Sequence, residues 1–106
     1  MLHTTCHTYD SKQCCSINIS SVTLYYSYST LIAACGYDAN GTFVAKRHEN
    51  YFSNTTARHF SAMNCNYKDR ATEDELHQFV TDLLADQLLN TDENLHMIRN
   101  QLKKAA

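Results

Sequence analysis

Apolar and polar residues alternate along the N-terminal half of the chain with the two-residue period of β-strands. The alternation runs through Ile17 and Ile19 and resumes at positions 22, 24, 26 and 28. Its phase slips by one residue at Ser20-Ser21. This slip indicates either two strands or one strand with a bulge.

A second run, at 30–37, is apolar on both faces and predicts a central strand covered on both sides, although a buried helical turn would look similar. The segment Asp38-Ala39-Asn40-Gly41 follows it. Because Asn-Gly accepts positive φ at both central positions, we predict a type I′ hairpin turn. The return strand would occupy residues 42–52.

Helical spacing begins after this hairpin. Ser53 is a candidate N-cap, and Phe60, Met63 and Tyr67 share one helical face. They predict a short helix over 54–66, lying on the sheet. The connector 68–70 is charged.

A second helix is predicted from Thr72 and Glu75, which have the spacing of a capping box. An apolar stripe extends it to residue 88 or 89 and comprises Leu76, Phe79, Val80, Leu83 and Leu84. Leu95, Ile98 and Leu102 predict a final helix, although the two could also form one bent rod.

These elements predict an α+β fold: a small antiparallel sheet with a short helix, followed by a C-terminal α-helical hairpin. The chain is expected to be a single domain over residues 1–106. Residues 1–15 lack periodicity and form either a loose N-terminal arm or a poorly formed first strand. The sheet and short helix would occupy 16–66, and the C-terminal helices 72–104.

Composition places the chain among globular proteins, with 106 residues, 43% hydrophobic and 19% charged. A net charge of −2 gives no general attraction to nucleic acid. The sequence shows neither a secretory signal nor an apolar run long enough to span a membrane. Its five cysteines, an odd number, are therefore expected to be reduced thiols in a cytoplasmic protein.

The N-terminal segment contains possible zinc ligands: His3, Cys6, His7, Cys14 and Cys15. Thiolate and imidazole groups suit zinc, but the spacing matches no two-knuckle pattern, and no C-x-x-C is present. We therefore predict no metal site and no cofactor, with structural zinc as the alternative.

A second candidate cluster contains Arg47, His48, Tyr51, Arg58 and His59. If the short helix folds back on the hairpin, these side chains could contact a phosphate or nucleic acid, or act as an acid/base pair. Thr56 and His59 also suit a structural role at the start of the helix. No catalytic set emerges, so we do not expect an enzyme.

The predicted second helix also has an acidic strip. Glu75, Asp82 and Asp86 fall within about 40° of one another, beside Phe79. We interpret these four residues as a candidate partner-binding surface that meets basic side chains, with an ordinary solvated helix edge as the alternative.

Two segments carry a resemblance: Ser27-Tyr28-Ser29-Thr30-Leu31-Ile32-Ala33 and Tyr51-Phe52-Ser53-Asn54-Thr55-Thr56-Ala57-Arg58-His59. They resemble a small bacteriophage domain family of unknown function, in which an S-Y-x-T-x-I-A strand accompanies a Y-S-x-T-T-x-x-H helix start. Here Phe52 intervenes in the second motif. The resemblance covers about residues 27–60. It implies a phage or mobile-element origin and the cytoplasm of a host bacterium, and no known active site.

Together these observations lead us to expect a small phage-encoded interaction protein that inhibits a host system by binding, such as an anti-CRISPR or other anti-defence inhibitor. Its partner would be a host protein or protein–nucleic-acid complex, not a membrane, and a homodimer is compatible with this expectation. The alternative is a nucleic-acid-binding phage regulator that uses the basic and histidine-containing edge. A small metal-dependent hydrolase is a third, weaker interpretation.

Overall fold

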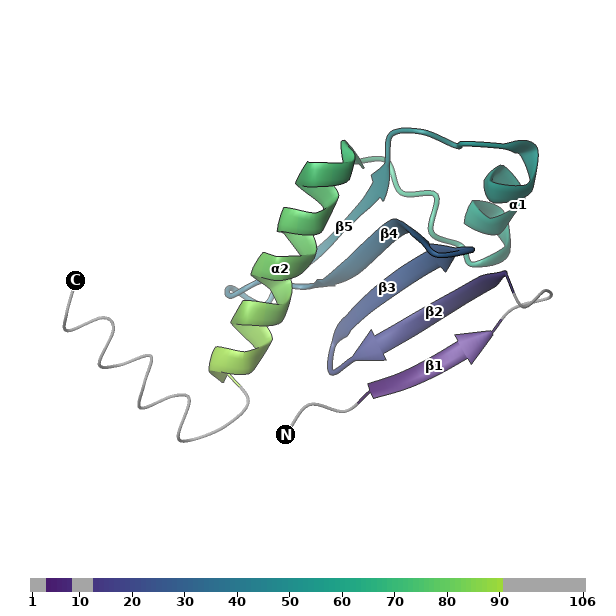
Figure 1. The fold of residues 1–106 in the computed structure, drawn as a ribbon. Helices are drawn as coiled ribbons and strands as arrows, with labels where there is room; N and C mark the ends of the chain where they lie inside the picture. Colours follow the sequence, from purple (N-terminus) through teal and green to yellow (C-terminus); the bar gives the residue numbers. More distant parts are fainter. Residues whose placement is uncertain (1–3, 9–12, 91–106) are drawn as a thin grey trace.

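The computed structural model describes residues 4–8 and 13–90 and has an α+β fold. In this part of the chain a six-stranded sheet carries two helices (Figure 1). The strands follow one another across the sheet in sequence order, and all neighbours are antiparallel except the last pair, β5 and β6. The strands are β1 (Thr4–Thr8), β2 (Cys14–Ile19), β3 (Val22–Ser27), β4 (Thr30–Tyr37), β5 (Phe43–His48) and β6 (Arg70–Ala71).

The helices are α1 (Asn54–Ala62) and α2 (Glu73–Asn90), and each contributes to a different hydrophobic cluster. Ala33 and Ala34 are both fully buried, and as neighbours in β4 they point to opposite faces of the sheet. Ala34 belongs to the cluster of α2 and Ala33 to that of α1. The central strand is therefore covered on both sides, as its apolar run predicts.

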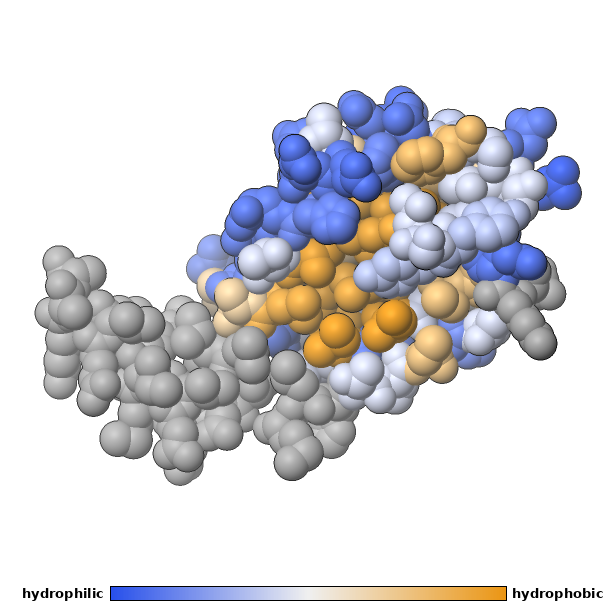
Figure 2. All heavy atoms as spheres, in the orientation of Figure 1, coloured by the Kyte–Doolittle hydropathy of each residue, from blue (hydrophilic) through white to orange (hydrophobic). Residues whose placement is uncertain are grey.

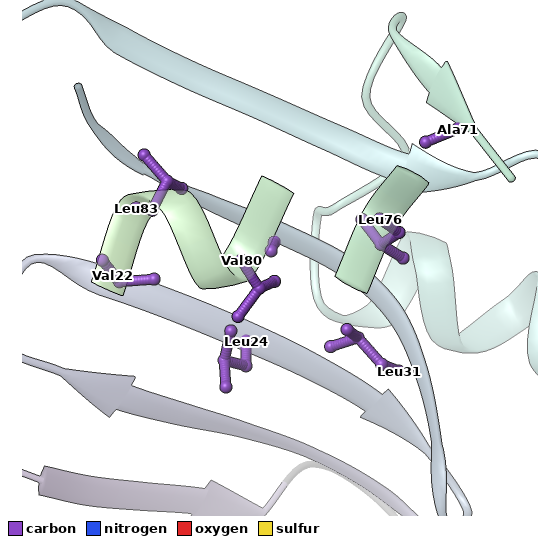
Figure 3. Close-up of a cluster of buried hydrophobic side chains, with 8 residues drawn as sticks. Val22, Leu24, Leu31, Ala71, Leu76, Val80 and Leu83 are labelled. Atoms are coloured by element: carbon purple, nitrogen blue, oxygen red, sulfur yellow. The ribbon is translucent and has the colours of Figure 1, made fainter. Parts of the chain in front are cut away.

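The cluster under α2 is the larger one (Figure 3). The helix contributes Leu76, Val80 and Leu83, each at most 9% exposed, which confirms the helical stripe. The strands contribute Val22, Leu24, Leu31, Ala34 and Ala71. Figure 2 shows hydrophobic surface continuing beside α2 on this face of the sheet, where Ile17, Ile19 and Leu84 are half-buried.

The cluster under α1 combines Phe60 and Met63 with Cys14, Ile32, Ala33 and Cys65. Tyr67 packs against it, so the three residues predicted to share one face do contact the same core. The helix itself is shorter than predicted. It ends at Ala62, and Asn64 then takes a left-handed φ of 53°, which stops further helical turns.

The N-terminal segment differs from the loose arm that was one of the two expectations for residues 1–15. Thr4–Thr8 form the edge strand β1, and Cys14 already begins β2. All five residues of β1 are exposed, so the strand has no apolar alternation to reveal it in the sequence. At Ser20-Ser21 the phase slip marks two separate strands, and Ser20 has a φ of 55° in the connection.

The β4–β5 hairpin is present, but its turn is not the predicted type I′. Among the residues of this connection only Gly41 has positive φ, at 78°. The carbonyl of Asp38 instead accepts from Gly41 N at 3.0 Å, and its Oδ1 accepts from Asn40 N and Thr42 N. The aspartate side chain organises the turn, so Asn40 does not need positive φ.

The capping box of α2 is confirmed. Thr72 N donates to Glu75 Oε1 at 3.0 Å, and Glu75 N donates to Thr72 Oγ1 at 3.2 Å. The predicted final helix with Leu95, Ile98 and Leu102 lies outside the described residues. Within those residues, neither helix combines the length and apolar character that crossing a membrane requires.

Candidate functional site at the α1 end of the sheet

A buried hydrogen-bond network joins the end of β3 to the first turns of α1. Ser27 Oγ lies 2.6 Å from His59 Nδ1 and 3.0 Å from Thr56 Oγ1. Ser53 caps the helix by accepting from Thr56 N at 3.1 Å, and its hydroxyl donates to Thr56 Oγ1. Ser27, Thr56 and His59 are each at most 7% exposed. These polar groups satisfy one another and hold α1 against the sheet.

Two exposed aromatic residues flank this network, and both have an unusual backbone. Tyr28 follows Ser27 and has a φ of 57°, while Phe52 precedes Ser53 and has a φ of 64°. Their side chains are 56% and 55% exposed. A bulky residue in the left-handed region costs about 1–3 kcal/mol, and such strain concentrates at functional sites.

Histidine rings lie beneath both aromatic side chains. The Tyr28 ring is 5.8 Å from the His59 ring, and the Phe52 ring is 4.6 Å from the His48 ring. His48 is in turn oriented by Asn50, whose backbone N donates to His48 Nδ1 at 3.0 Å. The exposed aromatic pair therefore rests on rings that are themselves buried and hydrogen-bonded. We call Tyr28 and Phe52 the aromatic pair.

Arg47 lies behind this surface and is completely buried. Its guanidinium donates to the carbonyl oxygens of His48 and Glu49 and to Asn66 Oδ1, at 2.8, 3.2 and 2.7 Å. The charge also lies over the rings of Tyr51 and Phe60, at 4.0 and 4.7 Å from their centroids. Carbonyl dipoles and ring faces, rather than a carboxylate, thus stabilise this buried cation.

Tyr51 covers the guanidinium from the solvent side and is 41% exposed. Its hydroxyl donates to Asn66 Oδ1 at 3.4 Å. The hydrogen bond with Asn66, followed by the influence of Arg47, lowers the pKa of Tyr51 from its ordinary value of 10.0.

The structure gathers the basic and histidine-containing cluster in one region but does not expose it as one surface. Arg47, His48 and His59 are buried, and their hydrogen-bonding groups contact the protein itself. Only Tyr51 and Arg58 reach solvent. The interpretation of His59 as a structural residue fits this geometry, although its partner is the side chain of Ser27 rather than backbone.

The acidic strip lies on α2, far along the chain from the aromatic pair. Phe79 and Asp86 are half-buried, and Glu75 and Asp82 are exposed. Two of the carboxylates already have partners in the protein: Glu75 belongs to the capping box, and Asp82 Oδ1 accepts from Gln78 Nε2 at 2.9 Å. The ring of Phe79 lies 5.5 Å from Lys46 Nζ. Reversing the charge of Glu75 would therefore also remove one of the two hydrogen bonds of the capping box.

The thiols and imidazoles of the N-terminal strands point in different directions. Cys14 is buried in the α1-side cluster, while its neighbour Cys15 faces the other side of the sheet. Cys6 is exposed on β1, and none of the five cysteines forms a disulfide. In the part of the chain that the structure describes, no group of three or more His, Cys, Asp or Glu is arranged to hold a metal ion; His3 lies outside that part.

The residue that sequence reasoning missed is Ser27. Its hydroxyl is the common partner of Thr56 and His59. The only signal for it was its place in the S-Y motif, next to the helix-start motif that contains Ser53, Thr56 and His59. The structure brings these two segments of the chain into contact.

Comparison with known proteins identifies one family that this chain matches. Searches of curated proteins and of solved structures each find no match to the chain. A family model described as "Family of unknown function (DUF8033)" matches residues 3–78. This range covers the whole sheet, α1 and the first turns of α2, and it contains the Ser27–Thr56–His59 network and the aromatic pair. The chain therefore belongs to the DUF8033 family, whose function is unknown.

Proposed function

We propose that this protein acts by binding a protein partner through the aromatic pair, Tyr28 and Phe52, and that it is an interaction protein rather than an enzyme. The observation that carries the proposal is the left-handed backbone at both residues. Two large side chains are held in solvent by backbone conformations that their residue types rarely adopt. Stability alone would favour Gly or Asn at both positions.

The surroundings of the aromatic pair support this role. Exposed aromatic residues are enriched at the centres of protein interfaces, where they supply large contact areas at low entropic cost. Here their bases are fixed by the Ser27–Thr56–His59 network and by the stack of Phe52 on His48. A rigid, preorganised surface loses little conformational entropy on binding.

The buried groups argue against catalysis at the same place. Ser27 and His59 are the residue types that serve as nucleophile and base in hydrolases. Ser27 is only 2% exposed, however, and its hydroxyl also contacts Thr56. A substrate would need to displace α1 to reach it. Ser27 and His59 therefore fit a structural role beneath a binding surface better than a role in hydrolysis.

For the partner, we propose a host protein in an infected bacterium, and specifically a component of a defence system such as a CRISPR effector. The support for this finer statement is the resemblance of the two motifs to a phage domain family. The acidic strip on α2 would then act as a secondary surface, where Asp82 and Asp86 attract basic side chains of a nucleic-acid-binding complex.

The test replaces the aromatic pair without changing the backbone. Asn tolerates positive φ, so the double variant Tyr28→Asn/Phe52→Asn removes the rings and keeps the turn geometry. The matched control is Tyr37→Asn/Phe43→Asn. These residues are 47% and 54% exposed, and their rings contact each other edge to face in the β4–β5 hairpin, at the other end of β4.

Each protein would be used to capture partners from host lysate, with and without nuclease, and would be expressed in cells with an active CRISPR system that are challenged by a targeted phage. We expect wild type and control to capture the same nuclease-resistant protein and to protect the phage, and the Tyr28/Phe52 variant to do neither. Equal capture by all three proteins would show that the aromatic pair does not bind the partner. Loss of the captured material with nuclease would favour nucleic-acid binding instead. Capture without phage protection would reject only the defence-system partner.

A further inference from the structure

The outer edge of β1 differs from the other edge of the sheet. β1 is the terminal strand of the described sheet, with five residues that are all exposed and none of which is Asp, Glu, Lys, Arg or Pro. The opposite edge, β6, has two residues, and one is the exposed Arg70. Sheet edges are usually protected from pairing by charge, proline or shortness. β6 has two of these devices, and β1 has none.

Among the described residues, the face above β1 and β2 is also less covered than the rest of the sheet. α2 packs on β3, β4, β5 and β6. Ile17 and Ile19 of β2 pack against the same cluster as Leu24, yet they are only half-buried. Cys6 lies opposite Ile17 in the β1–β2 register, so its side chain shares this face.

We propose that β1 pairs antiparallel with β1 of a second copy of this chain, about a two-fold axis that passes at Cys6. Cys6 is the middle residue of the strand, so this register lets all five residues pair. Cys6 meets Cys6 of the second copy, Thr5 meets His7, and Thr4 meets Thr8. The two sheets become one continuous sheet, in which the apolar faces of the two β2 strands lie between the two α2 helices.

A second copy suits this edge better than a charged peptide does. An uncharged strand meets no like-charge repulsion when it pairs with itself, and it offers no charge that would select another partner. The contact is small: stable interfaces bury about 1,200–2,000 Å² in total, and five paired residues supply only part of that. We therefore expect a weak dimer whose population rises with concentration.

The first experiment measures the mass of the full chain by sedimentation equilibrium over a wide range of protein concentration. Thr5→Lys places a charge opposite His7 in both symmetry-related pairs and should weaken dimerisation at least tenfold. The matched control is Thr42→Lys, the same substitution at an exposed residue of the β4–β5 connection. The control should dimerise like the wild type. Circular dichroism of both variants shows whether each is folded.

The second experiment uses Cys6 as a reporter of the register. The Cys6 and Cys15 thiols of one chain are close enough to hydrogen-bond, so Cys15→Ser first removes this competing partner. Diamide then oxidises two Cys6 thiols: one S–S bond forms, and the two hydrogens and two electrons pass to diamide, which becomes the hydrazine. We expect a reducible covalent dimer, absent from Cys6→Ser/Cys15→Ser.

A wild-type chain that is monomeric at every concentration would overturn the proposal. A dimer that survives Thr5→Lys and gives no Cys6 cross-link would also overturn it, because the contact would then lie elsewhere. If Thr5→Lys failed to fold, the presence or absence of the Cys6 cross-link in the Cys15→Ser chain would still test the proposed strand pairing. These outcomes are independent of the aromatic pair, because neither Tyr28 nor Phe52 belongs to β1.

Discussion

The Oγ of Ser27 lies 2.6 Å from the Nδ1 of His59, although 32 positions separate the two residues. This contact joins the end of β3 to α1, and Thr56 completes it. Because all three groups are buried, removal of Ser27 would leave His59 Nδ1 without its partner, whereas Thr56 would keep the hydrogen bond from Ser53. The position of the aromatic pair depends on these hydrogen bonds, since Tyr28 directly follows Ser27 and Phe52 directly precedes the cap residue Ser53.

We expect Ser27→Ala and His59→Ala each to lower the free energy of unfolding by about 1–3 kcal/mol, because both remove the buried hydrogen bond between Ser27 and His59. The double variant should cost less than the sum of the two, since it removes both ends of one interaction. Urea denaturation measures all three. His77→Ala, at an exposed position of α2, is the control and should change stability by less than about 0.5 kcal/mol. Strict additivity would contradict a direct coupling.

Arg47→Lys should lower the free energy of unfolding by about 1.5–3 kcal/mol, the range for lost hydrogen bonds to a charged group. Lysine lacks the planar guanidinium that lies on Tyr51 and Phe60 while donating to three oxygens. The same substitution at the exposed Arg58 is the control and should have little effect. If both variants unfolded at the same denaturant concentration, the buried stack would not contribute to stability.

The structure also predicts a loss of stability in alkali. Burial raises the pKa of the Cys65 thiol from its ordinary value of 9.0 to about 12, and burial likewise raises the pKa of Tyr25 to about 12. Both groups hold their protons longer in the folded than in the unfolded chain. Their stabilising contribution is therefore complete below the unfolded pKa values and is lost as pH rises through about 12.

Chemical denaturation between pH 8 and pH 11 would measure this loss. Cys65→Ala should flatten the decline relative to wild type, after correction for the cost of the smaller side chain at pH 7. Cys6→Ala, which removes an exposed thiol, is the control and should leave the slope unchanged. An unchanged slope in Cys65→Ala would mean that its thiol does not ionise on unfolding.

Gly41→Ala should lower the free energy of unfolding by about 1–2 kcal/mol, because an L-residue at a φ of 78° is strained. The added Cβ would meet nothing within 4 Å, so the cost comes from the backbone alone. Gly41→Asn should cost less, since Asn tolerates the left-handed region. Thermal melts of the two variants provide the test. If Ala and Asn were equally tolerated, the turn would relax into another conformation.

The sequence predicted the elements that local patterns encode. The alternation around Val22, the apolar run of β4, the Ser53 cap and the Thr72–Glu75 capping box all correspond to observed elements. For residues 1–15 a strand was only one of two alternatives, because the fully exposed β1 has no apolar alternation. β6 was not predicted, because two residues carry no periodic signal.

The geometry of the candidate site was harder to predict because it depends on contacts between distant residues. Arg47 was expected at a surface, since arginine is almost never fully buried unless it is paired. It is buried because Phe60, Tyr51 and Asn66 enclose it, and these residues come from α1 and the loops around it. The partner of His59 likewise lies in another strand. No local spacing rule anticipates such pairs.

The strand order has a consequence for folding during synthesis. Strands β1 to β5 each pair with the next strand in the chain, so this part of the sheet can assemble in the order in which the ribosome makes it. Arg47, near the end of β5, is made before its partners, and Asn66 follows 19 residues later. A nascent chain that ends between them has a complete meander but a guanidinium that must stay in water. The arrival of Phe60 and Asn66 is therefore the event that encloses the guanidinium, whereas the larger cluster on the other face of the sheet forms only when α2 has been made.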